Sequence, residues 1–176
     1  RYRDQCLAWS SWSDPTPFNT SSSQLTDNLL ENPGAENGLD AWLTIEGVLE
    51  SLTAGECAGT NPFEGNTYFG IGGLCEDNAY GMAYQIVDVV DYQNEIDNGS
   101  VVANYGAYLS DYSGYDIPSF ALQFLDESET LLASTDTIQS VETQWTLYQD
   151  LWAIPIGTRK IKYLLMGERS NPPNPT

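Results

Sequence analysis

Several segments of the chain alternate between apolar and polar residues, with the two-residue period of a strand that buries one face. The longest is residues 100–112, where Ala103 and Tyr105 share one face while Val102 and Asn104 share the other. Comparable segments lie at residues 83–90, 120–126, 143–152 and 158–167. The pattern therefore predicts strands over most of the chain from residue 83 onward.

Residues typical of turns separate these segments. Residues 97–99, 113–116 and 156–157 are rich in the glycine, asparagine and aspartate that tight turns favour. The only helix that the sequence predicts is a short one at residues 91–97. About six to eight strands joined by such turns, with almost no helix, indicate an all-β fold, an antiparallel β-sandwich.

The first 27 residues differ in composition from the rest of the chain. Residues 11–27 are rich in serine, threonine, proline and aspartate, as linkers and extended arms are, and residues 4–12 have the composition of a short strand. We therefore expect an N-terminal arm or linker at 1–27, a sandwich domain at 28–170 and a proline-rich tail at 171–176. Because no charged and apolar leader follows Arg1, we expect that any signal peptide has been removed or left out.

The charge of the chain is strongly negative. Six basic residues stand against 25 acidic ones, there is no histidine, and the net charge is -19. Such a surface repels nucleic acid and anionic membranes, so we exclude both as partners. The sequence also lacks the apolar run of about 18 residues that a transmembrane helix needs. The acidity either keeps the protein soluble or provides oxygen ligands for hard cations.

The three cysteines favour an extracellular protein. Cys57 and Cys75 flank a loop-like stretch that a disulfide can close, and their spacing is not that of a zinc site. One cysteine is left over whichever pair forms, and Cys6 is the candidate for a bond to another chain. Sequons at Asn19 and Asn98 agree with a secreted protein.

A series of short motifs occurs in one order along most of the chain. They are NLLENPGAE at 28–36, Trp42, YFGIGG at 68–73, AYQIVDV at 83–89, YGAYLSDY at 105–112 and IPIGTRKIKYLL at 154–165. In this order they resemble the galactose-binding-domain-like jelly rolls, a superfamily with many non-catalytic carbohydrate-binding modules. The opening is also similar to the glycoprotein-recognising domain of some F-box proteins. The resemblance covers about residues 28–170, and it is specific for the fold but not for a ligand.

The chain departs from this superfamily after its last predicted strand. Members commonly close with a strand of the kind D-x-Y-F-D, whereas residues 171–176 are NPPNPT, and three prolines cannot supply a central strand. A sandwich that lacks one strand has an open edge, which can accept a strand from elsewhere. Residues 4–12 are the candidate donor, within the chain or between identical subunits.

The resemblance also implies a calcium site. In similar jelly rolls the acidic residue that matches Glu36 often binds a structural calcium with turn carbonyls and an acidic residue of the last strand. Asp40 is close enough in sequence to contribute, but the last-strand partner has no counterpart here. The alternative is a solvated carboxylate at a turn. Trp42, which follows, is expected to pack in the core rather than to stack on a sugar.

A cluster of tyrosines between residues 104 and 116 is the candidate glycan site. Sugars present C–H faces that lie against aromatic rings, and their hydroxyls bond to carboxylates and amides. The alternative is that these tyrosines only cover a half-buried sheet surface. The candidate ligand-binding residues are Tyr105, Tyr108, Asp111, Tyr112, Tyr115 and Asp116.

The sequence argues against an enzyme. Without histidine, no Ser-His-Asp or Cys-His arrangement is possible, and with 25 acidic residues no particular carboxylate pair is distinguished. Two functions are compatible with these observations. One is a calcium-stabilised, extracellular module that binds a glycan or glycoprotein without catalysis. The other is a structural subunit of an extracellular filament or matrix that assembles by strand donation.

Overall fold

Strand β10 is the central strand of the largest sheet of the protein, which has six strands. The computed structural model describes residues 25–169 except 77 and 112–114. β10 pairs antiparallel with β4 on one side and with β6 on the other, and the strand order is β1-β4-β10-β6-β7, with β8 also paired to β6. The strands are β1 (Leu43–Gly47), β4 (Tyr80–Asp88), β6 (Asp116–Leu125), β7 (Leu131–Ser134), β8 (Ile138–Gln139) and β10 (Lys160–Arg169).

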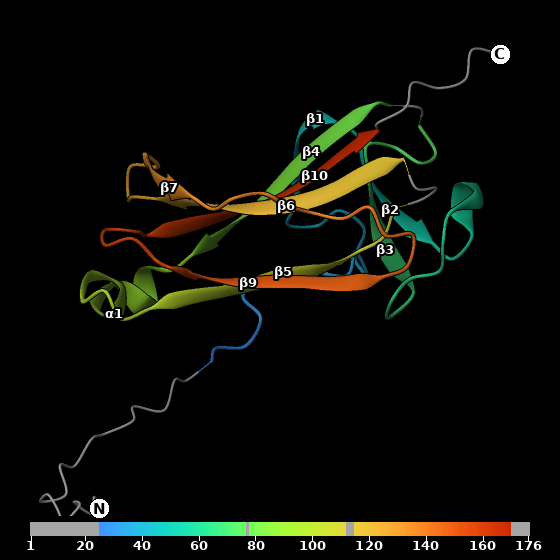
Figure 1. Cartoon of the computed structure of the whole chain (residues 1–176). Helices are drawn as coiled ribbons and strands as arrows, with labels where there is room; N and C mark the ends of the chain where they lie inside the picture. Colours follow the sequence, from blue (N-terminus) through green and yellow to red (C-terminus); the bar gives the residue numbers. More distant parts are fainter. Residues whose placement is uncertain (1–24, 77, 112–114, 170–176) are drawn as a thin grey trace, which may run out of the picture.

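The remaining strands form two separate antiparallel pairs. β2 (Leu49–Thr53) pairs with β3 (Thr67–Ile71), and β5 (Val102–Leu109) pairs with β9 (Thr146–Ala153). Figure 1 shows β5 and β9 facing the six-stranded sheet, with β2 and β3 at the right-hand end. The short helical pieces are η1 (Glu56–Ala58), η2 (Val90–Tyr92) and α1 (Gln93–Asp97). The two layers make the antiparallel all-β sandwich that the sequence predicts.

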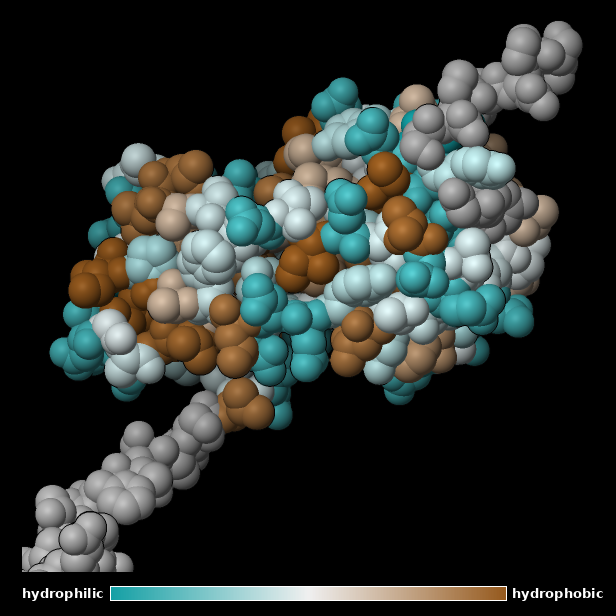
Figure 2. Space-filling model, viewed as in Figure 1, coloured by the Kyte–Doolittle hydropathy of each residue, from teal (hydrophilic) through white to brown (hydrophobic). Residues whose placement is uncertain are grey.

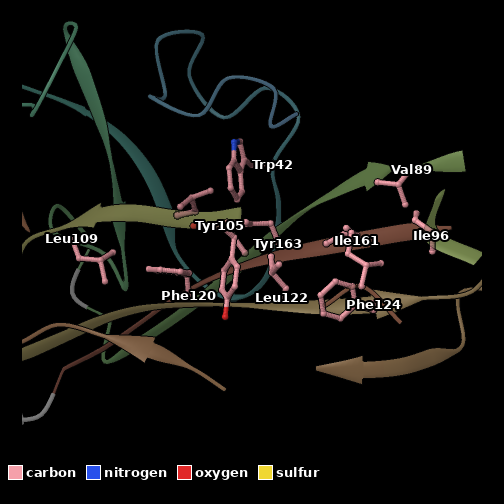
Figure 3. Packing of buried hydrophobic residues seen from close by; sticks show 13 residues of the cluster. Trp42, Val89, Ile96, Tyr105, Leu109, Phe120, Leu122, Phe124, Ile161 and Tyr163 are labelled. Atoms are coloured by element: carbon pink, nitrogen blue, oxygen red, sulfur yellow. The ribbon is translucent and has the colours of Figure 1, made fainter. Parts of the chain in front are cut away.

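Aromatic side chains from both layers meet in the core (Figure 3). Phe120 of β6 stacks on Tyr163 of β10 with ring centroids 5.8 Å apart, and Tyr105 of β5 meets Phe120 edge-on at 6.0 Å. Trp42 packs edge-on against Tyr163 at 6.2 Å and is 7% exposed, so it is a core residue, as expected. Such pairs stabilise a core beyond the area that they bury.

A hydrogen bond joins the two layers at the same place. The Tyr163 hydroxyl donates to the carbonyl oxygen of Gly106 in β5, at 3.0 Å. Burial raises the pKa of Tyr163, and nearby Tyr105 raises it further, so the hydroxyl stays a donor at any physiological pH. The bond therefore fixes β5 relative to β10.

All five patterned segments form strands, but the short strands β1, β2, β3, β7 and β8 were not predicted. The patterned segments correspond to β4, β5, β6, β9 and β10, and the expected helix at 91–97 is present as η2 followed by α1. β1, β2 and β3 have five residues each, too few for alternation to stand out, and β1 is exposed along its whole length. The arm at 1–24 and the tail at 171–176 lie outside the described residues.

The surface seen in Figure 2 mixes polar and apolar side chains rather than forming one apolar field. Within residues 25–169, gaps aside, no helix has the length and apolar character needed to cross a membrane.

The aromatic core predicts a large cost for truncating Phe120, which is fully buried. We expect Phe120→Ala to lower the free energy of unfolding by about 3–5 kcal/mol, because the lost ring leaves a cavity between the layers. Chemical denaturation measures this cost. Val141→Ala is the control, since Val141 is 62% exposed. A loss below about 1 kcal/mol for Phe120→Ala would contradict this account of the core.

Candidate functional site

The structure separates the tyrosines of the predicted glycan site. Tyr105 is 7% exposed and belongs to the core, whereas Tyr108 is 41% exposed and Tyr115 is 57% exposed. Tyr112 lies outside the described residues. Asp111 is 2% exposed, so neither it nor Tyr105 presents its side chain to solvent. Tyr105 and Asp111 are therefore too deeply buried to contact a glycan.

Asp111 and Asp116 lie at the two ends of the connection between β5 and β6, which belong to different sheets. The Asp116 N–H donates to Asp111 Oδ1 at 3.1 Å, and the Asp111 N–H donates to the Glu142 carbonyl at 2.8 Å. Burial raises the pKa of Asp116, and the Asp111 carboxylate raises it further, while Arg169 at 4.0 Å opposes the shift. These contacts hold the chain where it turns from β5 to β6.

Tyr108 belongs to an exposed surface on β5 and β9 that faces away from the core, here called the outer face. Side chains alternate along both strands, so every second residue of each strand points outward. Tyr108 lies opposite Leu147, and Leu147 and Leu151 are 46% and 62% exposed. The outer face consists of Asn104, Gly106 and Tyr108 of β5, opposite Leu151, Gln149 and Leu147 of β9, together with Phe63.

Phe63 extends this face from a distant loop. Its ring stacks on Tyr108 with centroids 3.6 Å apart and an interplanar angle of 18°, and Phe63 is 50% exposed. Nothing in the sequence pattern pointed to Phe63, because its loop has no periodicity and its partner is far along the chain. The two rings make an aromatic platform that is open to solvent.

The loop that carries Phe63 is anchored from several sides. The Trp145 indole N–H donates to the Asn61 carbonyl at 2.8 Å, and Trp145 packs edge-on against Tyr68 at 5.8 Å. Before the loop, a disulfide joins Cys57 to Cys75, the pair that the sequence analysis selected. The platform is thus tied to β9 and to β3.

Glu36 anchors the other end of the same loop. Its carboxylate accepts the backbone N–H of Asn66 at 2.7 Å and of Thr67 at 3.0 Å, and it also accepts the Asn66 side-chain amide at 3.2 Å. These bonds, led by the Asn66 N–H, hold the pKa of Glu36 below its ordinary value. At Gly65 a Cβ would lie 2.2 Å from Glu36 Oε1, so this close approach requires glycine.

The residues present fit a calcium ion poorly. The Glu36 carboxylate is already engaged by the loop amides, and Asp40 is exposed, with its N–H bonded to the Asn37 carbonyl. Over the described ranges there is no group of three or more histidine, cysteine, aspartate or glutamate side chains that could hold a metal. Calcium at Glu36 and Asp40 stays a prediction, and the glycan site proposed below does not depend on it.

A large groove opens between β3 and β5 and reaches residues of the outer face. Its volume is about 2480 Å³, and it is lined by Thr67–Ile71 and Val102–Leu109 as well as by Leu147, Gln149 and Leu151. Pockets for small molecules enclose roughly 300–1,000 Å³. The groove is therefore larger than a site for one small molecule needs.

No model of a known protein family matches the sequence, and no curated protein matches it. Solved structures with similar folds do exist. One is the enzymatically active domain of the tailspike protein 4 of bacteriophage CBA120, at 14% identity and a TM-score of 0.56. The match covers 82% of this chain and 19% of the tailspike chain, so this chain spans about a fifth of that structure.

Two further similar structures contain carbohydrate-binding modules. A family 16 carbohydrate-binding module is 20% identical with a TM-score of 0.50, and the match covers 82% of this chain and 96% of the module. The CBM22-1 and GH10 modules of the Clostridium thermocellum xylanase 10B, solved with xylohexaose, are 17% identical with a TM-score of 0.51, over 82% of this chain and 26% of theirs. These likenesses confirm the fold that the resemblance to galactose-binding-like sandwiches implied.

The bonds to Glu36 predict a pH-dependent contribution to stability. The carboxyl has a lower pKa in the folded chain than in the unfolded chain, so its contribution is complete above the unfolded pKa, about 4.5, and disappears as the pH falls through the folded value. We expect Glu36→Gln to be less stable than wild type at neutral pH, and the difference to shrink below this pKa. Thermal melts at a series of pH values measure both stabilities.

Glu64→Gln is the matched control for this measurement, because Glu64 is an exposed residue of the same loop. It should melt like wild type at every pH. A Glu36→Gln deficit that persists unchanged at the lowest pH would show that the charge of Glu36 is not responsible.

Proposed function

We propose that the protein is a non-catalytic, extracellular module that binds a glycan on the outer face. The observation that carries this proposal is the exposed stacked pair of Phe63 and Tyr108 on the outer face of a sandwich similar to that of carbohydrate-binding modules. The disulfide Cys57–Cys75 supports an extracellular location, since disulfides persist in oxidising compartments.

The chemistry of the outer face suits a sugar chain. The C–H face of a pyranose ring packs against the face of an aromatic ring, and Phe63 and Tyr108 remain 50% and 41% exposed although they stack on each other. Further along, Asn104 and Gln149 are exposed amides that can donate to and accept from sugar hydroxyls. Aromatic contacts thus supply affinity, and the amides supply orientation.

Gly106 lies in the middle of this face, opposite Gln149. A Cβ there would be 2.5 Å from the Tyr148 carbonyl and 2.8 Å from the Gln149 Cβ, so the close approach of β9 requires glycine. The position adds no side chain between Tyr108 and Asn104 on the outer face.

The charge of the chain narrows the class of glycan. With a net charge of -19, the protein repels anionic polysaccharides such as uronate-rich or sulfated chains. We therefore expect neutral polysaccharides to bind and polyuronates not to bind. Affinity electrophoresis against a panel of both kinds at physiological salt measures this selectivity. Preferential binding of the anionic members would contradict the expectation.

The aromatic platform predicts which substitutions weaken binding. Phe63→Ala and Tyr108→Ala each remove a ring that the glycan contacts, and each should weaken binding by about ten-fold or more, as losses of buried aromatic anchors do. Isothermal titration with the best neutral glycan of the panel measures the affinities. Tyr84→Ala is the matched control, since Tyr84 is a strand tyrosine of the opposite sheet, next to Lys162.

The control should bind like wild type, and all three variants should retain the melting behaviour of a folded sandwich. If Phe63→Ala and Tyr108→Ala both bind the glycan with unchanged affinity, the outer face is not the binding site. A loss confined to Tyr84→Ala would place binding on the other sheet.

A further inference from the structure

Two strand edges are left without a partner strand on the same side of the sandwich. Across the described part of the chain, β3 pairs with β2 alone and β5 pairs with β9 alone, so each has one unpaired edge. Backbone N–H and C=O groups along such an edge seek hydrogen-bond partners, and an exposed edge is a template for another strand.

Both edges line the groove described above, and core residues form its floor. Leu122, Ile161 and Tyr163 lie at the bottom of the groove, between the residues of β3 and those of β5. The groove lies where one more strand would fit between β3 and β5, and the inward side chains of such a strand would cover this floor.

The start of the described chain lies in the same groove. Residues 25–30 line it, and Leu25 and Leu29 are 79% and 42% exposed. Among described residues, no backbone-to-backbone hydrogen bond involves 25–31; Glu31 is instead held by the side chain of Gln85, at 2.7 and 2.8 Å. The chain therefore enters the fold beside two open edges without pairing to either of them.

We infer that the groove accepts a β-strand between β3 and β5, and that the occupant is the N-terminal segment of the same chain, residues 4–12. Two segments lie outside the described ends, 1–24 and 170–176. The second has three prolines in its last six residues, which lack the N–H that a central strand must donate. Residues 4–12 contain no proline, and Leu7 and Trp9 share one face of a strand, so both can cover the floor.

The length of the connecting chain favours an intramolecular strand. Residues 13–24 can span up to about 40 Å when extended, whereas the eight residues of β5 rise roughly 27 Å. The segment can therefore reach any part of the groove from Leu25. A tethered segment has an effective concentration in the millimolar range, far above that of a second copy in dilute solution.

The charge of the residues before the segment favours the same occupant. Asp27, Glu64, Glu95 and Glu168 line the groove, together with Arg169, the single cation among its described residues. The segment itself carries only Asp4, but Arg1 and Arg3 directly precede it and bring positive charge to this mostly acidic lining. The inference concerns the completed sheet and goes beyond glycan binding.

Hydrogen exchange on the full chain tests the inserted strand. In wild type, the amides of β3 and β5 that do not bond to β2 or β9 should exchange slowly. In the double variant Leu7→Pro with Trp9→Pro they should exchange about ten-fold faster or more, because proline cannot pair with an edge. Amides of β10 should exchange equally in both. Ser22→Pro in the connecting segment is the control and should match wild type.

Equal exchange of β3 and β5 in wild type and the double variant would overturn the inference. The inference would also be overturned if β3 and β5 were protected from exchange only at high protein concentration and sedimentation gave the mass of a dimer. In that case a second copy of the chain would donate the strand. Glycan affinity is read separately by titration. If no glycan binds to the outer face but hydrogen exchange still differs between wild type and the double variant, only the proposed function is overturned.

Discussion

The contact between Tyr163 and β5 is the interaction on which the rest of the structure depends. Tyr163 lies on the central strand of the larger sheet, stacks on Phe120, and donates its hydroxyl to the Gly106 carbonyl. A buried hydroxyl without a partner is costly, so this bond has one favourable geometry and sets the position of β5 over β10. Since β5 carries Tyr105 inward and Tyr108 outward, the same contact positions both the core and the outer face.

The loop that completes the outer face is held at both ends. Trp145, which directly precedes β9, and Glu36 from the first turn bond to the loop on either side of Phe63. A platform that is ordered before a ligand arrives avoids the entropy cost of ordering it on binding. Glu36 therefore contributes to the site as a support for the loop, although it does not lie on the outer face itself.

Much of the fold, but only part of the candidate site, could be predicted from the sequence. Alternation over residues 100–112 correctly placed Tyr105 and Tyr108 on opposite faces, yet it could not tell which face was buried until Phe120 and Tyr163 packed against Tyr105. Phe63 was missed because its place depends on the Trp145–Asn61 bond, which joins residues 84 positions apart. The Asn104–Leu151 and Gly106–Gln149 pairs likewise depend on strand register, which no local pattern encodes.

The central claim is that a neutral glycan lies along β5 and β9 beside Phe63. The most direct test is a backbone amide chemical-shift map of the wild-type chain, titrated with a neutral oligosaccharide selected from an array. The account predicts shifts concentrated at Phe63, in Val102–Leu109 and in Thr146–Ala153, with little change in Tyr80–Asp88. Shifts centred on Tyr80–Asp88, or no binding by any member of a broad neutral array, would contradict it.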